Sequence, residues 1–316
     1  MKGLTDIVGI RVGHASDFDA VTGCTVVLCG AGAVGGVDVQ GSASGTEELA
    51  TLAPGHVTDR VHAIVLAGGS AFGLEALSGV RRYLEQRGVG FRTGAAVVPI
   101  VAGAILYDLG IGKATVRPTR EMGEAAAAAA TAGPVQEGAV GAGTGATVGK
   151  LFGMRQAMKS GIGSAAVELP GGVLVASLAV VNAFGDVRDP VGGKLIAGAR
   201  RAAGSMELAD TESEMKRGRQ GGFGRTNTTL AVVATNARLN KVGAGKLAQL
   251  AGLGMARTIY PVNTMFDGDV VFALSLGDLE ADVNALGVAA AEALAAAVVR
   301  AVKMAPTVAG VPGLAG

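Results

Sequence analysis

The chain has 316 residues, of which 49% are hydrophobic and 17% charged, and its formal net charge is +1. This charge, with no basic stripe interleaved with aromatic residues, argues against nucleic-acid partners. The apolar run at 285–302 is interrupted by Glu292 and Arg300, which favours a buried helix over a membrane span of about 20 apolar residues. No basic and then apolar segment opens the chain, so we expect no secretory signal and a cytoplasmic protein without membrane partners.

Apolar runs rich in β-branched residues alternate along the chain with helical patterns. The predicted strands are residues 25–28, 63–67, 97–101, 162–168, 173–181, 230–235 and 270–276. The predicted helices are residues 72–86, 120–131, 194–203, 243–253 and 282–302. Pro170-Gly171-Gly172 predicts a hairpin turn between two of the strands. Antiparallel hairpins mixed with separate helices favour the α+β class.

One segment differs in composition from the rest of the chain. Residues 209–226 are charged, rich in glycine and nearly free of apolar side chains, which predicts an exposed, mobile linker. The residues that follow, Asn227-Thr228-Thr229, open a run typical of a core strand. The sequence therefore predicts an abrupt junction between linker and strand at Asn227 and Thr228.

Two glycine-rich motifs suggest nucleotide binding, but neither meets its structural requirement. Residues 30–35 fit G-x-G-x-x-G after a strand, yet the residues that follow are poor helix formers, and a helix N-terminus is needed to meet a pyrophosphate. Residues 145–150 resemble the end of a phosphate loop, but Leu151 replaces the Ser or Thr that would hold Mg²⁺. The three histidines lack metal-ligand spacing. We therefore expect no cofactor and no metal.

Cleavage between Asn227 and Thr228 would give the Thr228 hydroxyl a base of its own. A threonine hydroxyl is a weak nucleophile at neutral pH, whereas a free α-amine has a pKa of about 7.7–8.0 and lies within reach of that hydroxyl. An N-terminal threonine is a known variant of the catalytic triad, and the same hydroxyl can attack the carbonyl that precedes it. Taken alone, however, these two residues are better explained as a turn followed by an ordinary strand start.

Seven motifs, spread along nearly the whole chain, help to interpret the junction at Asn227 and Thr228. Three of them are Leu66-Ala-Gly-Gly-Ser-Ala-Phe-Gly-Leu-Glu75, Gly143-Thr-Gly-Ala-Thr-Val-Gly-Lys150 and Asn227-Thr-Thr229, and the others are residues 3–14, 97–108, 179–182 and 267–269. In this order they resemble the aminopeptidase/D-esterase family of self-cleaving hydrolases, which includes β-aminopeptidases, a pantetheine hydrolase and nylon-oligomer hydrolases. No single motif is decisive, but the ordered set is highly specific.

The resemblance implies a four-layer αββα sandwich similar to that of N-terminal-nucleophile hydrolases. It further implies a single domain, residues 1–316, that cuts itself into a large fragment, 1–227, and a small fragment, 228–316, which stay together. Thr228 matches the nucleophile, a position that is usually Ser in the β-aminopeptidases. Because Thr stands there, the chain looks more like the pantetheine and nylon-oligomer hydrolases.

The resemblance also implies roles for several other side chains. Asn182 matches an Asn on the oxyanion side, where a neutral donor faces developing negative charge. Lys150, Asp267 and Asp269 match a polar cluster beside the nucleophile. We expect a Lys between two carboxylates to stay charged and to govern the protonation of the α-amine; the alternative is a purely structural ion pair.

Ser70 and Phe72 are the candidate substrate-binding residues, as part of the pocket wall. Phe72 departs from the family pattern, because some members carry there a Tyr whose hydroxyl reaches the oxyanion. The high apolar fraction and the alanine-rich last helix suggest a homo-oligomer, and a tetramer of cleaved pairs would fit the family.

The expected function is that of a self-processing amidohydrolase or aminopeptidase acting through an acyl-enzyme. Its expected substrates are short peptides, or amides and oligomers of ω- or β-amino acids. One alternative is an acyltransferase of the ornithine acetyltransferase type, which shares self-cleavage at Thr but needs an amine acceptor. The other is an inactive binding protein with the same fold.

Overall fold

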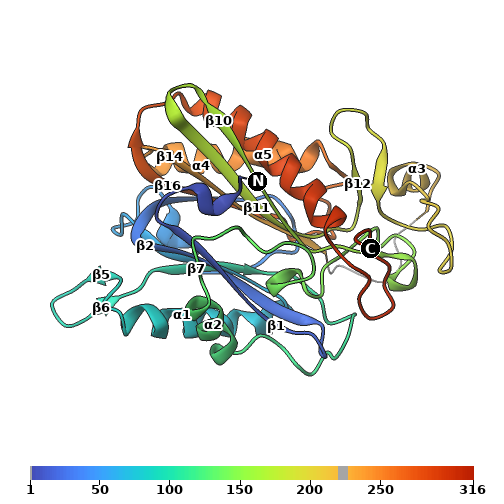
Figure 1. Ribbon diagram of the computed structural model, residues 1–316, viewed down its shortest axis with the longest axis horizontal. Helices are drawn as coiled ribbons and strands as arrows, with labels where there is room; N and C mark the ends of the chain where they lie inside the picture. Colours follow the sequence, from blue (N-terminus) through green and yellow to red (C-terminus); the bar gives the residue numbers. More distant parts are fainter. Residues whose placement is uncertain (1, 220–226) are drawn as a thin grey trace.

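The computed structural model describes residues 2–219 and 227–316. Within them, two β-sheets lie face to face, and a pair of helices covers the outer face of each sheet (Figure 1). The α+β class and the αββα order of layers expected from the sequence are confirmed.

The first sheet contains β1, the first half of β2, β4, β7 and β3, in that order. Its strands are β1 (Ile10–Asp17), β2 (Thr22–Val39), β4 (Val61–Ala67), β7 (Val101–Ile105) and β3 (Gly45–Glu47). Neighbouring strands are antiparallel, except that β4 and β7 are parallel.

The second sheet contains β10, β11, β14, β16 and the last residues of β2. Its other strands are β10 (Ile162–Leu169), β11 (Val173–Asn182), β14 (Thr228–Ala237) and β16 (Val270–Leu279). The predicted hairpin is confirmed, because β10 and β11 pair antiparallel across the Pro170–Gly172 turn. β14 is parallel to β16 and antiparallel to β11, so it occupies the middle of this sheet.

The long strand β2 joins the two sheets. Its register with β4 shifts between Leu28 and Ala33, and beyond this point the strand pairs with β16 instead. The glycine-rich motif at 30–35 lies inside this strand. It therefore does not open a helix, as a dinucleotide site would require.

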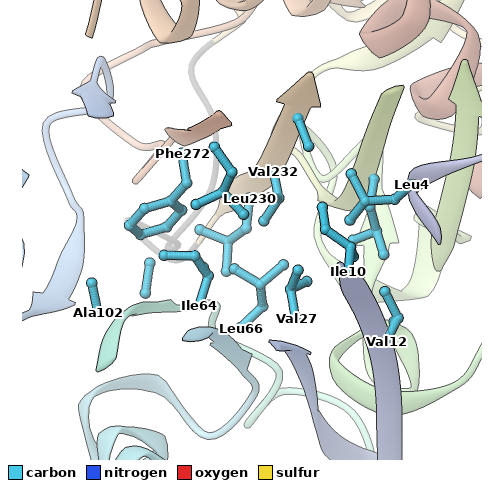
Figure 2. Packing of buried hydrophobic residues seen from close by; sticks show 14 of the residues in the cluster. Leu4, Ile10, Val12, Val27, Ile64, Leu66, Ala102, Leu230, Val232 and Phe272 are labelled. Atoms are coloured by element: carbon cyan, nitrogen blue, oxygen red, sulfur yellow. The ribbon is translucent and has the colours of Figure 1, made fainter. Parts of the chain in front are cut away.

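Three apolar cores separate the four layers. The central core lies between the sheets and contains Ile64, Leu230 and Phe272 (Figure 2). The outer cores lie under α4 (Lys241–Ala256) with α5 (Val283–Lys303), and under α1 (Glu75–Glu85) with α2 (Arg120–Ala128). Three of these helices begin after a side chain that caps a backbone N–H, and the caps are Thr119, Asn240 and Asp282.

The remaining elements are short. They are β5 (Phe91–Arg92), β6 (Val97–Val98), β8 (Thr147–Val148), β9 (Met158–Lys159), β12 (Asp186–Arg188), β13 (Leu195–Ala197), α3 (Thr211–Lys216) and β15 (Ile259–Tyr260). Single 3₁₀ turns are formed by Leu4–Asp6, Leu49–Leu52, Ser70–Leu74, Gly141–Gly143, Met154–Gln156 and Pro170–Gly172.

Two of the predicted elements need correction. The helix expected at 194–203 is wrong, because Leu195–Ala197 pairs with β12 and the Ala199 N–H donates to the carboxylate of Asp186 at 2.7 Å. The strand expected at 97–101 is split into β6 and β7. Pro99 lies between the two parts, and proline has no N–H to offer to a strand ladder.

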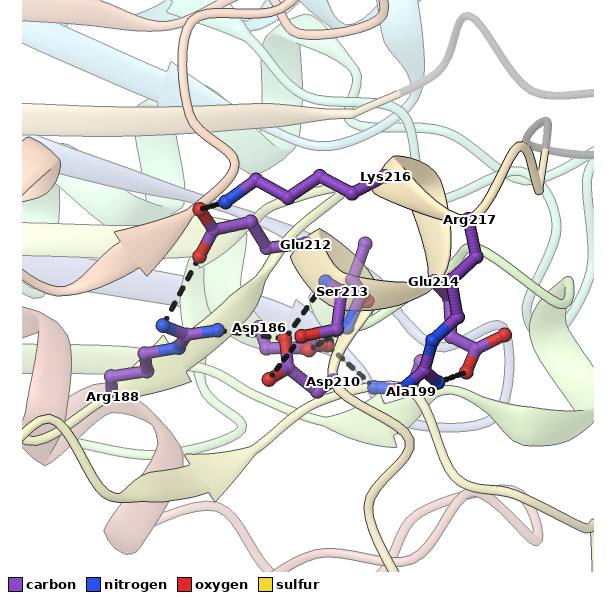
Figure 3. Close-up of polar contacts among 10 residues, drawn as sticks. Asp186, Arg188, Ala199, Asp210, Glu212, Ser213, Glu214, Lys216 and Arg217 are labelled. Carbon is purple, nitrogen blue, oxygen red and sulfur yellow. Dashed lines mark hydrogen bonds and ion pairs between the residues drawn. The ribbon is translucent and has the colours of Figure 1, made fainter.

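The linker expected at 209–226 is partly wrong. Its first part contains α3, and Thr211 at the start of this helix is fully buried. The Asp186 carboxylate accepts hydrogen bonds from the N–H and hydroxyl of Thr211, at 2.6 and 2.7 Å, and Arg188 pairs with Asp210 and Glu212 (Figure 3). The composition of this segment did not indicate a helix, because the contacts that hold α3 in place are polar. Residues 220–226 lie outside the described residues.

α5 is the one helix in the described parts of the chain that is long and apolar enough to cross a membrane. It packs against β10, β11 and α4, and two thirds of its most apolar window is buried there. Burial between other elements therefore accounts for its composition, as the sequence predicts.

Phe272 provides a test of the central core. Its side chain is fully buried between the sheets, so we expect Phe272→Ala to lower the free energy of unfolding by about 3–5 kcal/mol. Urea denaturation measures this change. Val8→Ala is the control, because Val8 is 89% exposed and should change stability by no more than about 0.5 kcal/mol. Equal effects of the two substitutions would contradict the described packing.

Candidate active site

Thr228 is the first residue of β14 and is buried, with 3% of its surface exposed. Because β14 lies between β11 and β16, Thr228 faces Asn182, the last residue of β11, across the ladder. On its other side, Asn227 forms a parallel bridge with Asp267, just before β16. The sheet topology thus brings three distant motifs to one end of adjacent strands.

The carbonyl of Asn227 belongs to the peptide bond predicted to be cut. Its oxygen accepts a hydrogen bond from the Thr228 hydroxyl at 2.5 Å and another from the N–H of Gly268 at 2.8 Å. The N–H and the side-chain amide of Asn227 both donate to the carbonyl of Phe266, at 3.2 and 3.1 Å. The peptide unit is therefore held firmly on both sides, with a hydroxyl and an amide donor on its oxygen.

Asn182 is fully buried and satisfied by its surroundings. Its Nδ2 donates to the carbonyl of Tyr107 at 3.0 Å, while its Oδ1 accepts from the Thr147 N–H at 3.1 Å and from Lys150 Nζ at 2.7 Å. These contacts determine which end of the amide faces Lys150. One of the two Nδ2 hydrogens is thus donated to the Tyr107 carbonyl.

Lys150 differs from expectation in its partners. Its Nζ donates to the backbone and side-chain oxygens of Asn182, at 2.8 and 2.7 Å, and among the described residues no carboxylate lies within ion-pair distance of it. Burial lowers the pKa of Lys150 to about 7, although Asp267 and Asp269 oppose the shift. Among the described residues, Lys150 therefore forms no direct ion pair with Asp267 or Asp269, and desolvation outweighs their attraction; that Lys150 stays charged remains a prediction.

Asp267 and Asp269 are nearly completely buried. Asp267 accepts from the Phe184 N–H at 3.1 Å and from the Thr264 hydroxyl at 2.5 Å, and Asp269 accepts from the N–H groups of Thr229 and Asn263, at 2.5 and 3.0 Å. Burial raises the pKa of both carboxyl groups, to about 7 for Asp269, where the charge of Asp267 adds to the effect. These carboxylates fix the backbone around Thr228.

A pocket of about 170 Å³ opens beside Lys150. Its lining residues are Tyr107, Asp108, Gly110, Ile111, Gly145, Thr147, Lys150 and Met154. Sequence reasoning assigned no role to Tyr107, although it lies within the recognised motif at 97–108. The signal that could have identified it is a polar aromatic residue two positions after a buried strand.

Ser70 and Phe72 are absent from the lining of this pocket. Ser70 has a left-handed backbone, with a φ of 53°, and its N–H donates to the carbonyl of Leu106 at 3.0 Å. Phe72 is 56% exposed, and the guanidinium of Arg117 lies 3.8 Å from the centre of its ring. Their role in substrate binding stays a prediction. No group of three or more His, Cys, Asp or Glu side chains suited to a metal occurs within residues 2–219 and 227–316.

Comparison with known proteins identifies the family of the chain. The model of Peptidase family S58 matches residues 2–315. The chain belongs to Peptidase family S58. The chain is thus a hydrolase of the class that acts on amide bonds, and the resemblance seen in the sequence is confirmed.

Relatives of this S58 chain include both peptidases and oligomer hydrolases. It is 40% identical to an uncharacterized aminopeptidase of Mycobacterium bovis, over 99% of this chain and 96% of the relative. It is 33% identical to a 6-aminohexanoate-oligomer endohydrolase of a Kocuria species, over 94% and 85% of the two chains.

Two solved structures share the fold of the S58 chain. A β-aminopeptidase of a Burkholderia species has a TM-score of 0.70 at 25% identity, covering 99% of this chain and 90% of the other. The L-aminopeptidase D-Ala-esterase/amidase of Ochrobactrum anthropi, described as a new variant of the Ntn hydrolase fold, has a TM-score of 0.73 at 19% identity, covering 96% and 86%.

The lowered pKa of Lys150 makes stability depend on pH. The amine titrates near 10.5 in its ordinary state and near 7 in the native protein, so between these values the unfolded chain holds more protons and stability rises with pH. This contribution is complete above pH 10.5 and is lost as the pH falls through 7.

Urea unfolding at a series of pH values tests this dependence. We expect Lys150→Met to reduce the slope of the unfolding free energy between about pH 7.5 and about pH 9.5 by up to about 1.4 kcal/mol per pH unit, which corresponds to one proton. Both proteins should carry Thr228→Ala, so that the chain stays whole. An unchanged slope would mean that Lys150 is charged in the native protein.

Proposed function

We propose that this chain is a self-processing amidohydrolase that cuts its own Asn227–Thr228 bond and then uses Thr228 as an N-terminal nucleophile. The main support for this proposal is the pair of hydrogen bonds that the Asn227 carbonyl oxygen accepts. The Thr228 hydroxyl lies 2.5 Å from this oxygen, next to the carbon that it would attack, and the Gly268 N–H already donates to the same oxygen at 2.8 Å. Attack places negative charge on that oxygen, where a preorganised donor stabilises it.

The proposed self-cleavage proceeds through an ester. Thr228 Oγ1 bonds to the carbonyl carbon of Asn227, the carbon–nitrogen bond breaks, and the leaving nitrogen takes the hydroxyl proton. Water then hydrolyses the ester, which frees the carboxylate of Asn227 together with the amine and hydroxyl of Thr228. The new amine, with a pKa of about 7.7–8.0 in its ordinary state, is a base suited to neutral pH.

Turnover would repeat the same chemistry on a substrate amide. The Thr228 amine accepts the hydroxyl proton as the oxygen attacks, the substrate's amine leaves with a proton, and water releases the acyl group. Asn182 lies opposite Thr228 in the ladder, which suits it to donate to the developing oxyanion. Lys150, with its pKa near 7, can exchange protons at the working pH.

The pocket and the relatives point to small linear substrates. Ile111 and Met154 give the pocket beside Lys150 apolar walls. The relatives are named as aminopeptidases and as endohydrolases of 6-aminohexanoate oligomers. We therefore propose short peptides, or amides and oligomers of β- or ω-amino acids, as substrates.

Thr228→Ala tests self-processing. The wild-type protein should separate into fragments 1–227 and 228–316, whose masses add up to that of the uncut chain plus one water, while Thr228→Ala should stay whole. Intact-mass spectrometry of both purified proteins distinguishes these states. A wild-type chain that stays whole after long incubation, or a variant that is cut, would contradict the proposal.

Gly268→Ala tests the environment of the bond. A Cβ at this position would lie 2.9 Å from Thr228 Oγ1 and 2.7 Å from the carbonyl of Ala43, so it should displace the hydroxyl and slow self-cleavage by about 10²-fold. The time course of fragment formation on a gel measures the rate. Gly94→Ala is the matched control, because its Cβ would meet nothing within 4 Å, and it should be cut at the wild-type rate. Equal rates for the two variants would contradict the described geometry.

A further inference from the structure

Lys159, on β9, is a fully buried lysine outside the group formed by Thr228, Asn182 and Lys150. Its Nζ donates to three backbone carbonyls, those of Gly143 at 2.9 Å, Ala146 at 2.8 Å and Ser160 at 2.5 Å. An ammonium group has three N–H donors, whereas a neutral amine has two. The three oxygens thus match the charged form, and they compensate for the loss of water around it.

Carbonyl dipoles hold this ammonium, and no carboxylate pairs with it directly. Within the described parts of the chain, Lys159 forms no ion pair. Burial lowers the pKa of Lys159 to about 7. The negative charge of Asp108 opposes this shift. The oxygens of Asp108 are themselves used by the Thr22 hydroxyl and the Gly69 N–H, each at 2.7 Å. The surroundings resemble the oxygen cage of a bound cation.

The loop that Lys159 holds leads directly to Asn182. Two of the three carbonyls belong to Gly143 and Ala146, and the next residue, Thr147, donates its N–H to Asn182 Oδ1 at 3.1 Å. Thr147 is also the partner of Lys159 across the β8–β9 ladder. The same loop contributes Gly145 and Thr147 to the pocket beside Lys150. A change in this loop would therefore move a hydrogen bond that orients the Asn182 amide.

We propose that Lys159, in the ammonium form that its three carbonyl acceptors match, positions the 143–147 loop and thereby the Asn182 amide for the chemistry of Thr228. It is a positioning residue, since it acts through the loop and touches no reacting atom. The inference rests on the proposed function, because the orientation of Asn182 matters to catalysis only if Thr228 reacts.

The inference can be tested by removing the ammonium group of Lys159 and then supplying a small soluble amine in its place. Lys159→Ala removes the ammonium together with its stem, and it should slow self-cleavage by about 10²-fold, the usual cost of a misplaced catalytic group. Propylammonium matches the missing atoms and should restore much of the rate, whereas 1-propanol fills a similar volume without charge and should not. The rate is followed as the appearance of fragments 1–227 and 228–316 after cell-free synthesis of the full chain.

Lys159→Met and Leu77→Ala complete the experiment. Lys159→Met keeps the length of the side chain but not its donors, so in the cut protein it should lower kcat by about 10²-fold and leave KM nearly unchanged. Leu77→Ala opens a cavity under α1, where Leu77 is fully buried, and controls for destabilisation; it should be cut at the wild-type rate.

The outcomes separate this inference from the proposed function. If the wild-type chain is not cut, the proposed function fails first. If it is cut, wild-type rates in Lys159→Met, or equal rescue of Lys159→Ala by propylammonium and 1-propanol, would overturn the role of Lys159 alone. A Lys159→Ala protein that fails to fold, and that propylammonium rescues no better than 1-propanol does, would overturn it as well.

Discussion

The position of β14 between an antiparallel and a parallel neighbour is the constraint on which the site depends. An antiparallel neighbour ends where β14 begins, and a parallel neighbour begins there. Asn182, at the end of β11, and the 267–269 segment, before β16, must therefore meet at Thr228. Segments at least 39 residues apart along the chain thus reach one point, and backbone hydrogen bonds of the sheet hold them there.

Desolvation is the second physical effect that shapes this end of the sheet. Lys150, Asp267 and Asp269 lie among apolar layers, and burial moves the pKa of Lys150 and that of Asp269 from opposite directions to about 7. For Lys150 and Asp269, the charged and neutral forms therefore differ less in free energy near neutral pH than they would in water. Each head group also forms a hydrogen bond with a backbone group: Lys150 with the Asn182 carbonyl, Asp267 with the Phe184 N–H and Asp269 with the Thr229 N–H.

The sequence indicated most of the fold because its patterns are local. A hairpin turn and the apolar patterns located β10, β11, α4 and α5, and the motif order pointed to the αββα layers. It failed where tertiary contacts decide the structure. The Asp186 carboxylate holds the 194–203 segment extended and anchors α3, and nothing in the composition of either segment reveals that contact. Similarly, the motifs identified Lys150 but not its hydrogen-bond partners on Asn182, because competing partners are a property of the folded chain.

The most direct test of the account is the location of the covalent acyl group. The cut protein is mixed with an activated ester of a β- or ω-amino acid, quenched in acid, and its two fragments are weighed and sequenced by mass spectrometry. The account predicts that the acyl mass appears on fragment 228–316, attached to Thr228 Oγ1, and disappears as product forms. An acyl group on fragment 1–227, or on any residue other than Thr228, would contradict the assignment of the nucleophile.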